Sequence, residues 1–162
     1  MSKIKGIELK NITNFRGHEG EELIQGNVYY NGKKVGFYSQ DAHGGCDNLD
    51  IDYNLDTELK NKVEEITYKY VGNELFKGID TLYGLTYTNH KPIGYEYLFM
   101  DLLTLMEHEK IYKKYIKKWN TNKIYIVYDN MWDIHICGTK LREEDANKVY
   151  YEYNGLEDFD IK

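Results

Sequence analysis

Cysteine is scarce in this chain: Cys46 and Cys137 are the only two in 162 residues. Two cysteines are too few for the disulfide framework of a small secreted domain. In an intracellular protein they are more often free thiols than a pair, so we expect no disulfide.

Long hydrophobic runs and nucleotide motifs are also missing. No apolar run reaches the roughly 18 residues that a membrane span needs, and the first residues lack the apolar core of a signal peptide. Neither G-x-x-x-x-G-K-[ST] nor G-x-G-x-x-G occurs, which excludes the phosphate-binding loops of those kinds. The formal net charge of −6 argues against direct nucleic-acid binding, because cationic side chains supply most of that affinity. We expect a cytoplasmic protein without membrane contact.

Positive charge is absent from one stretch, since no Lys or Arg lies between Val35 and Leu59. The acids of this stretch are Asp41, Asp47, Asp50, Asp52, Asp56 and Glu58. They account for the whole net charge of −6, because the acids elsewhere equal the 21 Lys and Arg residues in number. We call residues 41–58 the acidic segment. The rest of the chain is close to neutral.

The composition is that of one globular domain spanning residues 1–162. Hydrophobic residues make up 41% and charged residues 30%, which is typical of a folded protein. The 17 tyrosines suit half-buried strands and protein interfaces equally well. We predict an α+β fold in which an antiparallel sheet of about five strands packs against two to three helices.

The first half of the chain contains the clearest local signal. Residues 25–30 and 34–40 predict a β-hairpin, because Asn31-Gly32 readily adopts the positive φ angles of a type I′ turn. An imperfect apolar alternation over residues 4–12 predicts a strand before it.

Two loops are predicted around this hairpin. Residues 14–22 are polar and contain two glycines, so we expect an exposed loop there. Residues 41–53 are broken by Gly44-Gly45 and are predicted to be a loop with a short strand at 49–53.

A helix is predicted over residues 56–71. Asp56 suits the N-cap, Glu58 suits the positive end of the helix dipole, and Gly72-Asn73 suits a left-handed cap. Its apolar face consists of Leu59, Val63, Ile66 and Tyr70.

A longer helix is predicted over residues 95–119, with a bend or break at 107–109. It follows an ambiguous stretch in which residues 81–87 favour a strand and residues 89–92 a turn. Its second half has a basic face formed by Lys110, Lys113, Lys114, Lys117 and Lys118. This face is either solvated or a docking strip, and it also suits packing near the acidic segment.

The last third predicts a second hairpin from strands at 124–128 and 133–137. Residues 141–153 fit a helix, which we favour, or a strand. The acidic tail at 157–160 is predicted to fray.

Metal binding has two weak candidates. His43, Cys46, His135 and Cys137 are suitable zinc ligands, but their H-x-x-C and H-x-C spacings lack the paired cysteines of a structural site. An oxygen-rich calcium loop would use Asp41, Asp47, Asn48, Asp50 and Asp52. These residues lack the order of an EF-hand. We expect no metal and no cofactor.

Acid–base catalysis is the enzymatic alternative. Asp41 would orient His43, with His18 and Glu19 brought near by the sheet. Cys46 is a poor nucleophile because neighbouring negative charge disfavours its thiolate. The alternative is therefore a small metal-dependent or acid–base enzyme that uses His18, Asp41, His43 and Cys46. No complete catalytic motif stands beside them, and we expect no enzyme.

The acidic segment is better suited to contact with a protein. Its carboxylates alternate with apolar side chains, so they offer charge for association and anchors for affinity. The predicted partner-binding residues are Asp41, Asp47, Asp50, Asp52, Tyr53, Asp56 and Glu58.

The first quarter of the chain resembles a family. The pattern F-R-G-H-E-G at residues 15–20, followed by Q-G-N-V-Y-Y-N-G-K-K-V-G-F-Y-S-Q-D-A-H-G-G at 25–45, is similar to small proteins carried by phages and prophages of low-GC Gram-positive bacteria. In size and acidity the chain resembles anti-CRISPR and related anti-defence proteins.

The resemblance implies an inhibitor without catalysis. Such a protein would bind a host defence protein in the bacterial cytoplasm, for example a Cas9-type CRISPR nuclease, at a basic surface that normally handles nucleic acid. A remaining alternative is an interaction module of the phage particle or of its replication machinery.

Overall fold

The computed structural model describes residues 1–72, 94–129 and 140–162, together with the backbone of residues 134–137. It has the predicted α+β architecture, with helices α1 and α3 and two sheets in the described ranges. The strand predicted at 81–87 and the turn at 89–92 lie outside these residues.

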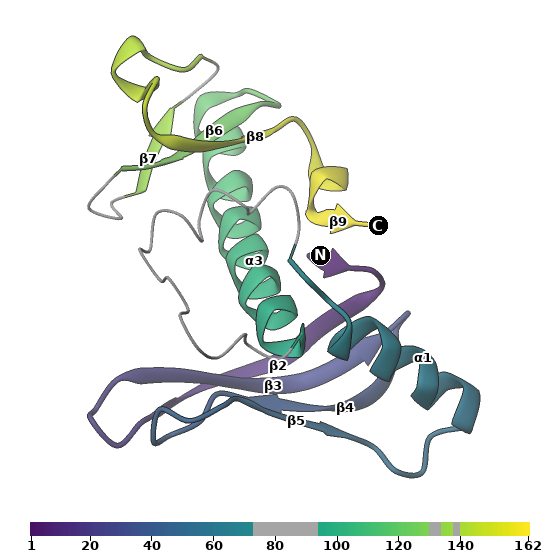
Figure 1. The fold of residues 1–162 in the computed structure, drawn as a ribbon. Helices are drawn as coiled ribbons and strands as arrows, with labels where there is room; N and C mark the ends of the chain where they lie inside the picture. Colours follow the sequence, from purple (N-terminus) through teal and green to yellow (C-terminus); the bar gives the residue numbers. More distant parts are fainter. Residues whose placement is uncertain (73–93, 130–133, 138–139) are drawn as a thin grey trace.

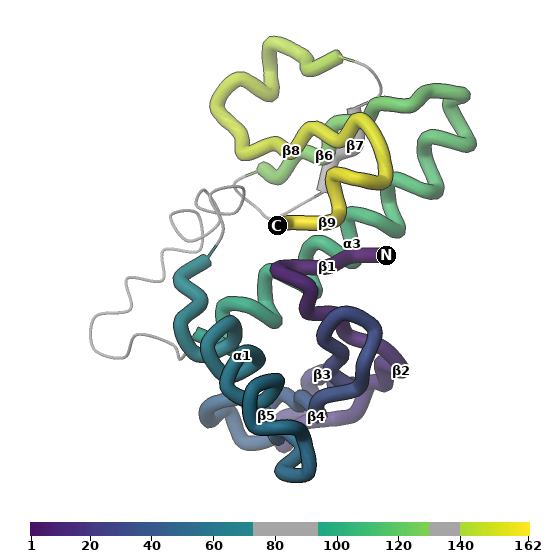
Figure 2. The backbone as a smooth tube through the Cα atoms, turned by 90° about the vertical axis from the view of Figure 1, so that its right-hand side faces the viewer, coloured from purple at the N-terminus to yellow at the C-terminus, as the bar shows by residue number. Residues whose placement is uncertain are grey.

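The larger sheet has six strands and is built mainly from the N-terminal third of the chain (Figure 1). Its strands in spatial order are β5 (Asn48–Ile51), β4 (Lys33–Ser39), β3 (Glu22–Tyr30), β2 (Ile7–Arg16), β1 (Lys3–Ile4) and β9 (Asp160–Ile161). All neighbours are antiparallel except β1 and β9, which are parallel. Both termini therefore lie side by side, in the middle of the molecule (Figure 2).

The smaller sheet has three antiparallel strands in the order β7 (Ile134–Cys137), β6 (Ile124–Tyr128) and β8 (Val149–Tyr153). The two predicted hairpins thus exist, but they lie in separate sheets rather than in one antiparallel sheet. Helix α3 (Gly94–Trp119) runs from the larger sheet to the smaller one (Figure 1).

The predicted type I′ hairpin is present between β3 and β4. Asn31 and Gly32 have φ angles of 47° and 82°, as this turn requires. A second positive-φ pair, Lys5 at 50° and Gly6 at 81°, turns β1 into β2 and divides the predicted first strand.

The loop predicted at 14–22 is confirmed at its centre but is wrong at both ends. Strand β2 continues to Arg16 and β3 begins at Glu22, so only residues 17–21 form the turn. The Arg16 guanidinium bonds the Gly20 carbonyl at 2.8 Å, and the Gly17 N–H bonds the Glu21 carbonyl at 2.9 Å. These local bonds allow polar residues to extend the hairpin beyond the apolar core.

Helix α1 (Thr57–Tyr68) begins as predicted, because the Asp56 carboxylate accepts from the N–H groups of Glu58 and Leu59. It ends at Tyr68, before the predicted end at residue 71. The chain turns away so that the Tyr70 hydroxyl donates to Asp101 on α3, at 2.6 Å.

Helix α3 is continuous, so the break predicted at 107–109 is wrong. His108 and Glu109 face the interior and find polar partners there, which makes an interruption unnecessary. The helix ends in a left-handed residue, Asn120 at φ 48°, and the Thr121 N–H bonds the Ile116 carbonyl at 3.2 Å.

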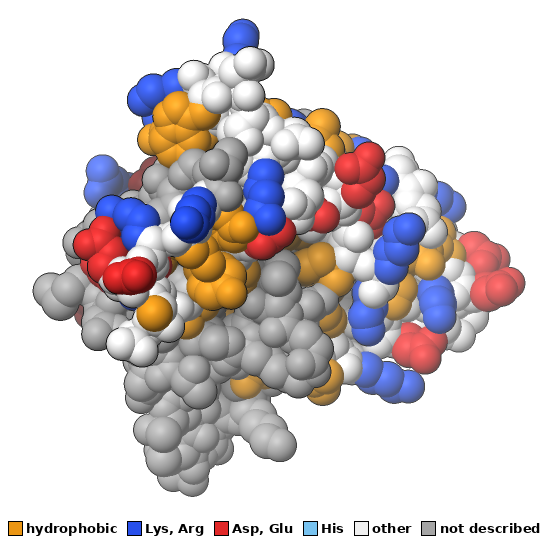
Figure 3. All heavy atoms as spheres, turned by 90° about the horizontal axis from the view of Figure 1, so that it is seen from above, with side chains coloured by type: hydrophobic (Ala, Val, Ile, Leu, Met, Phe, Trp, Pro, Cys, Tyr) orange, Lys and Arg blue, Asp and Glu red, His pale blue; other side chains and the backbone are white. Residues whose placement is uncertain are grey.

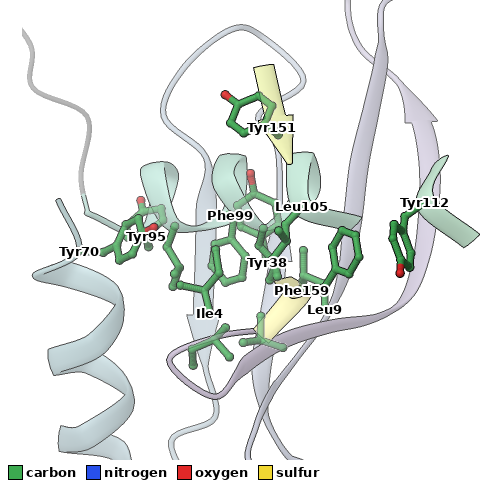
Figure 4. Close-up of a cluster of buried hydrophobic side chains, with 14 of the residues drawn as sticks. Ile4, Leu9, Tyr38, Tyr70, Tyr95, Phe99, Leu105, Tyr112, Tyr151 and Phe159 are labelled. Atoms are coloured by element: carbon green, nitrogen blue, oxygen red, sulfur yellow. The ribbon is translucent and has the colours of Figure 1, made fainter. Parts of the chain in front are cut away.

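The main core lies between α3 and both sheets (Figure 4). The rings of Tyr38 on β4 and Phe99 on α3 stack with centroids 4.2 Å apart. Ile4 and Leu9 from the larger sheet are buried in the same cluster as Tyr151 from the smaller sheet. One buried cluster therefore takes side chains from both sheets.

The C-terminal predictions need two corrections. Residues 141–153 form a short 3₁₀ turn (Glu143–Asp145) and strand β8 instead of a helix. The tail is not frayed: Leu156–Phe159 forms a second 3₁₀ turn, and Phe159 is fully buried. The Phe159 ring stacks on the Tyr153 ring with their centroids 4.5 Å apart. This contact holds the end of the chain against the core.

The Glu109 carboxylate of α3 is buried among these apolar residues. The Glu109 carboxylate accepts from the N–H and the hydroxyl of Ser2, each at 2.7 Å, and pairs with Lys113 at 2.5 Å. Burial alone would raise the pKa of Glu109, but the bonds from Lys113 and Ser2 outweigh it and lower the pKa to about 2.

None of the helices in the described ranges combines the length and the apolar composition of a membrane span.

Candidate functional site

The acidic segment begins in the loop after β4 and continues into β5, which pairs only with β4 in the part of the chain that the structure describes and so forms an edge of the larger sheet. The close approach of these two strands depends on Gly36, because a Cβ at this position would lie 2.3 Å from the Asp50 carbonyl oxygen. On the outer face, Phe37 and Asp50 are directly paired, and both side chains are exposed. The sheet thus presents an aromatic ring beside a carboxylate.

Asp47 is the member of the segment that is most firmly held. Its carboxylate accepts from the Tyr38 hydroxyl at 2.5 Å, its carbonyl accepts from the Tyr95 hydroxyl at 2.8 Å, and its N–H donates to Glu96 at 2.9 Å. Partial burial raises the pKa of Asp47, and the charge of Glu96 adds to this effect. Asp47 therefore joins the acidic segment to the first turn of α3.

The carboxylates of Asp41 and Asp56 accept hydrogen bonds from nearby backbone N–H groups. The Asp41 carboxylate accepts from the N–H groups of His43 and Gly45, at 2.7 Å and 3.1 Å, and these bonds lower its pKa. Asp56 caps α1. These two carboxylates order the loop and the helix start while they add negative charge to the surface.

Asp50, Asp52, Tyr53 and Glu58 face solvent. Among the described residues, none of the three acids takes part in an ion pair. Tyr53 is 83% exposed, between Asp52 and the cap of α1. Tyr53 and Asp52 thus lie on the short connection between β5 and α1, with Asp50 at the end of the strand before it and Glu58 in the first turn of the helix after it.

Basic and acidic side chains lie close together on other parts of the surface. On the face seen in Figure 3, Lys and Arg side chains are interspersed with acidic ones. The basic face of α3 is exposed, but Lys113 pairs with Glu109, and Lys114 and Lys118 lie over the Tyr115 ring, at 5.3 Å and 5.5 Å from its centroid. Within the described ranges, no ion pair joins these lysines to the acidic segment.

The residues of the enzymatic alternative are partly brought together. The His18 and His43 rings lie 5.4 Å apart, because the His18 N–H bonds the Ala42 carbonyl at 2.7 Å. Cys46 is an exposed free thiol. In the part of the chain that the structure describes, no group of three or more His, Cys, Asp or Glu side chains is arranged to hold a metal ion. The side chains of His135 and Cys137 lie outside that part.

Sequence reasoning missed the residues that position the segment. Tyr38, Tyr95 and Glu96 were assigned only to a strand and a helix, yet all three bond Asp47. No sequence pattern links residue 47 to residues 95 and 96, since the contact depends on how α3 crosses the sheet. The only local feature that marks any of these three residues is the position of Glu96, an acid in the first turn of a helix.

Comparison of this chain with protein-family models, with curated proteins and with solved structures finds no match.

Proposed function

We propose that this protein is a non-catalytic binding protein of the phage anti-defence type, which inhibits a host nuclease through its acidic segment. The observation that carries the proposal is Tyr53, which is 83% exposed between the carboxylates of Asp52 and Asp56 on the connection from β5 to α1. An exposed tyrosine offers a large contact area at a low cost in conformational entropy, and tyrosine is common at binding hot spots.

The charge distribution supports a basic partner. Asp50, Asp52 and Glu58 are exposed and form no ion pair with other described residues, so they are available to a cationic surface. Complementary charges would speed association, while the Tyr53 ring would slow dissociation. The positively charged nucleic-acid channel of a Cas9-type nuclease is a surface of this kind. Together with the sequence resemblance, this makes a CRISPR nuclease in the bacterial cytoplasm the first partner to test.

The test is a DNA-cleavage assay with a purified Cas9-type nuclease and its guide RNA. Wild-type protein should slow cleavage when added in stoichiometric amounts. Asp50→Lys combined with Asp52→Lys should weaken inhibition at least tenfold, and Tyr53→Ala should do so separately. Glu143→Lys is the matched control, since this acid is exposed on the 3₁₀ turn near the smaller sheet.

Two results would contradict the proposal. Wild-type protein that leaves cleavage unchanged across several Cas9-type nucleases would exclude this partner class. Full inhibition by the Asp50→Lys and Asp52→Lys double variant would show that the acidic segment is not the binding surface.

A second candidate is the acid–base or metal-dependent enzyme that uses His18, Asp41, His43 and Cys46. The contact between the His18 and His43 rings favours it. Against it, Asp41 is bonded to backbone N–H groups that lower its pKa, which makes it a weaker base. Loss of activity in His43→Ala with unchanged partner binding would favour the enzyme over the binding protein.

A further inference from the structure

A groove of about 690 Å³ lies between the first half of α3 and the strands β2, β3 and β4. Its apolar lining includes Ile12, Ile24, Tyr97, Met100, Leu103 and Met106. This volume lies within the range of about 300–1,000 Å³ that is typical of ligand sites. The groove adjoins the acidic segment, because Gly45 and Asp47 also line it.

The α3 side of the groove suits an apolar ligand. Met100 is 39% exposed there, although its neighbours Phe99 and Asp101 are buried. Methionine side chains adapt to ligands of different shape, because they are unbranched and polarizable. An apolar side chain placed beside Met100 would remove this exposed surface from water.

Charge makes the groove selective. Asp47 and Glu96 line it together, and the Asp47 N–H donates to Glu96 Oε1 at 2.9 Å. Their negative charges repel each other, so a cation beside both would relieve the repulsion. Glu107 and Lys110 also line the groove and offset each other, so its net charge is negative.

We propose that this groove binds a segment of the partner protein that places apolar side chains beside Met100 and a Lys or Arg side chain at Asp47 and Glu96. The inference rests on the proposed function, since it describes the part of the basic partner that the groove recognises. An acidic or purely apolar segment is disfavoured by the same two carboxylates.

The test uses two 12-residue model peptides with the same pattern of leucines, one with lysines and one with glutamates between them. Each is titrated into the full-length ¹⁵N-labelled protein and followed by NMR. The lysine peptide should shift the amide signals of residues 45–47 and 96–107. The glutamate peptide should bind at least tenfold more weakly.

Two variants test the two parts of the groove. Glu96→Gln removes the charge but keeps the oxygen that accepts from the Asp47 N–H, and it should weaken lysine-peptide binding about fivefold, the effect of one ion pair of about 1 kcal/mol. Met100→Lys replaces an exposed apolar side chain with a cation and should weaken binding at least tenfold. Glu143→Gln should leave affinity unchanged, since Glu143 does not line the groove.

Equal affinity of the two peptides, or unchanged binding by both Glu96→Gln and Met100→Lys, would overturn the inference. The nuclease assay separates it from the proposed function. Selective peptide binding without nuclease inhibition would support the groove and contradict the proposed function. Inhibition that survives Glu96→Gln and Met100→Lys would overturn the groove's role and leave the proposed function standing.

Discussion

The imidazole of His108 is bonded at Nε2 to the Tyr128 hydroxyl, 2.7 Å away, in the interior between α3 and the smaller sheet. Its Nδ1 is bonded to the Tyr153 hydroxyl at 2.8 Å, and the His108 side chain has no exposed surface. A neutral imidazole donates at one nitrogen and accepts at the other, and each tyrosine hydroxyl can take the complementary role. Burial lowers the pKa of His108 to about 4.

This buried imidazole predicts a stability loss in mild acid. The unfolded chain takes up a proton near the ordinary histidine pKa of 6.5, whereas the native state does so only near 4. The free energy of unfolding should therefore be unaffected by His108 above pH 6.5. It should fall by roughly 3 kcal/mol as the pH decreases from 6.5 to 4. Urea denaturation at several pH values measures this change.

His108→Gln is the control for the acid prediction. The variant should be less stable at pH 7 by about 2 kcal/mol, because Tyr128 and Tyr153 lose their shared partner. Its stability should then change much less between pH 6.5 and 4. Glu109, with a pKa of about 2 in the native state, acts mainly below this window. An equally steep profile in the variant would contradict the role of His108.

Local chemistry made some elements predictable. Asn31-Gly32 determined the β3–β4 turn, and Asp56 determined the start of α1, because each effect depends on residues close in sequence. The tail was mispredicted because its order depends on Phe159 packing against Tyr153 and Tyr112, a contact that its acidic neighbours conceal. The division into two sheets depends likewise on how α3 lies between them.

The candidate site was predictable to a similar degree. The charge pattern located the acidic segment, and the exposure of Asp50, Asp52 and Tyr53 agrees with a surface there. The groove was not predictable, since it is formed by β2, β3, β4 and α3 together. Residues distant in sequence shape it, and each of them reads locally as ordinary strand or helix packing.

Phe159→Ala should destabilise the whole protein. Its ring is fully buried and stacks on Tyr153, so truncation leaves a cavity and costs about 3–4 kcal/mol. Leu156→Ala, in the same turn but 50% exposed, should cost less than about 1 kcal/mol. Equilibrium urea denaturation compares the two. Similar small losses would mean that the tail is frayed in solution.

Tyr38→Phe should weaken the attachment of the acidic segment. The change removes the hydroxyl that donates to Asp47 and leaves a partly buried carboxylate with one bond fewer, at a cost of about 1–2 kcal/mol. Since that bond lowers the pKa of Asp47, the pKa should rise further in the variant, which ¹³C NMR of the carboxyl group measures. Tyr53→Phe is the matched control, because Tyr53 is 83% exposed. An unchanged Asp47 pKa in Tyr38→Phe would show that the bond is absent in solution.

Gly36→Ala should loosen β5 from the sheet. A Cβ at this position would lie 2.3 Å from the Asp50 carbonyl oxygen and 3.2 Å from the Ile51 Cα, and both of these atoms belong to the backbone. The strand must therefore move outward, which breaks the β4–β5 hydrogen bonds and displaces Asp50. Hydrogen exchange should become at least tenfold faster at the paired amides of residues 48–51, while exchange in β6 stays slow. Gly155→Ala is the control, because its new Cβ would meet only the mobile end of the Glu157 side chain. Unchanged exchange in Gly36→Ala would contradict the close packing of β5, and with it the rigid support that the sheet gives to the acidic segment.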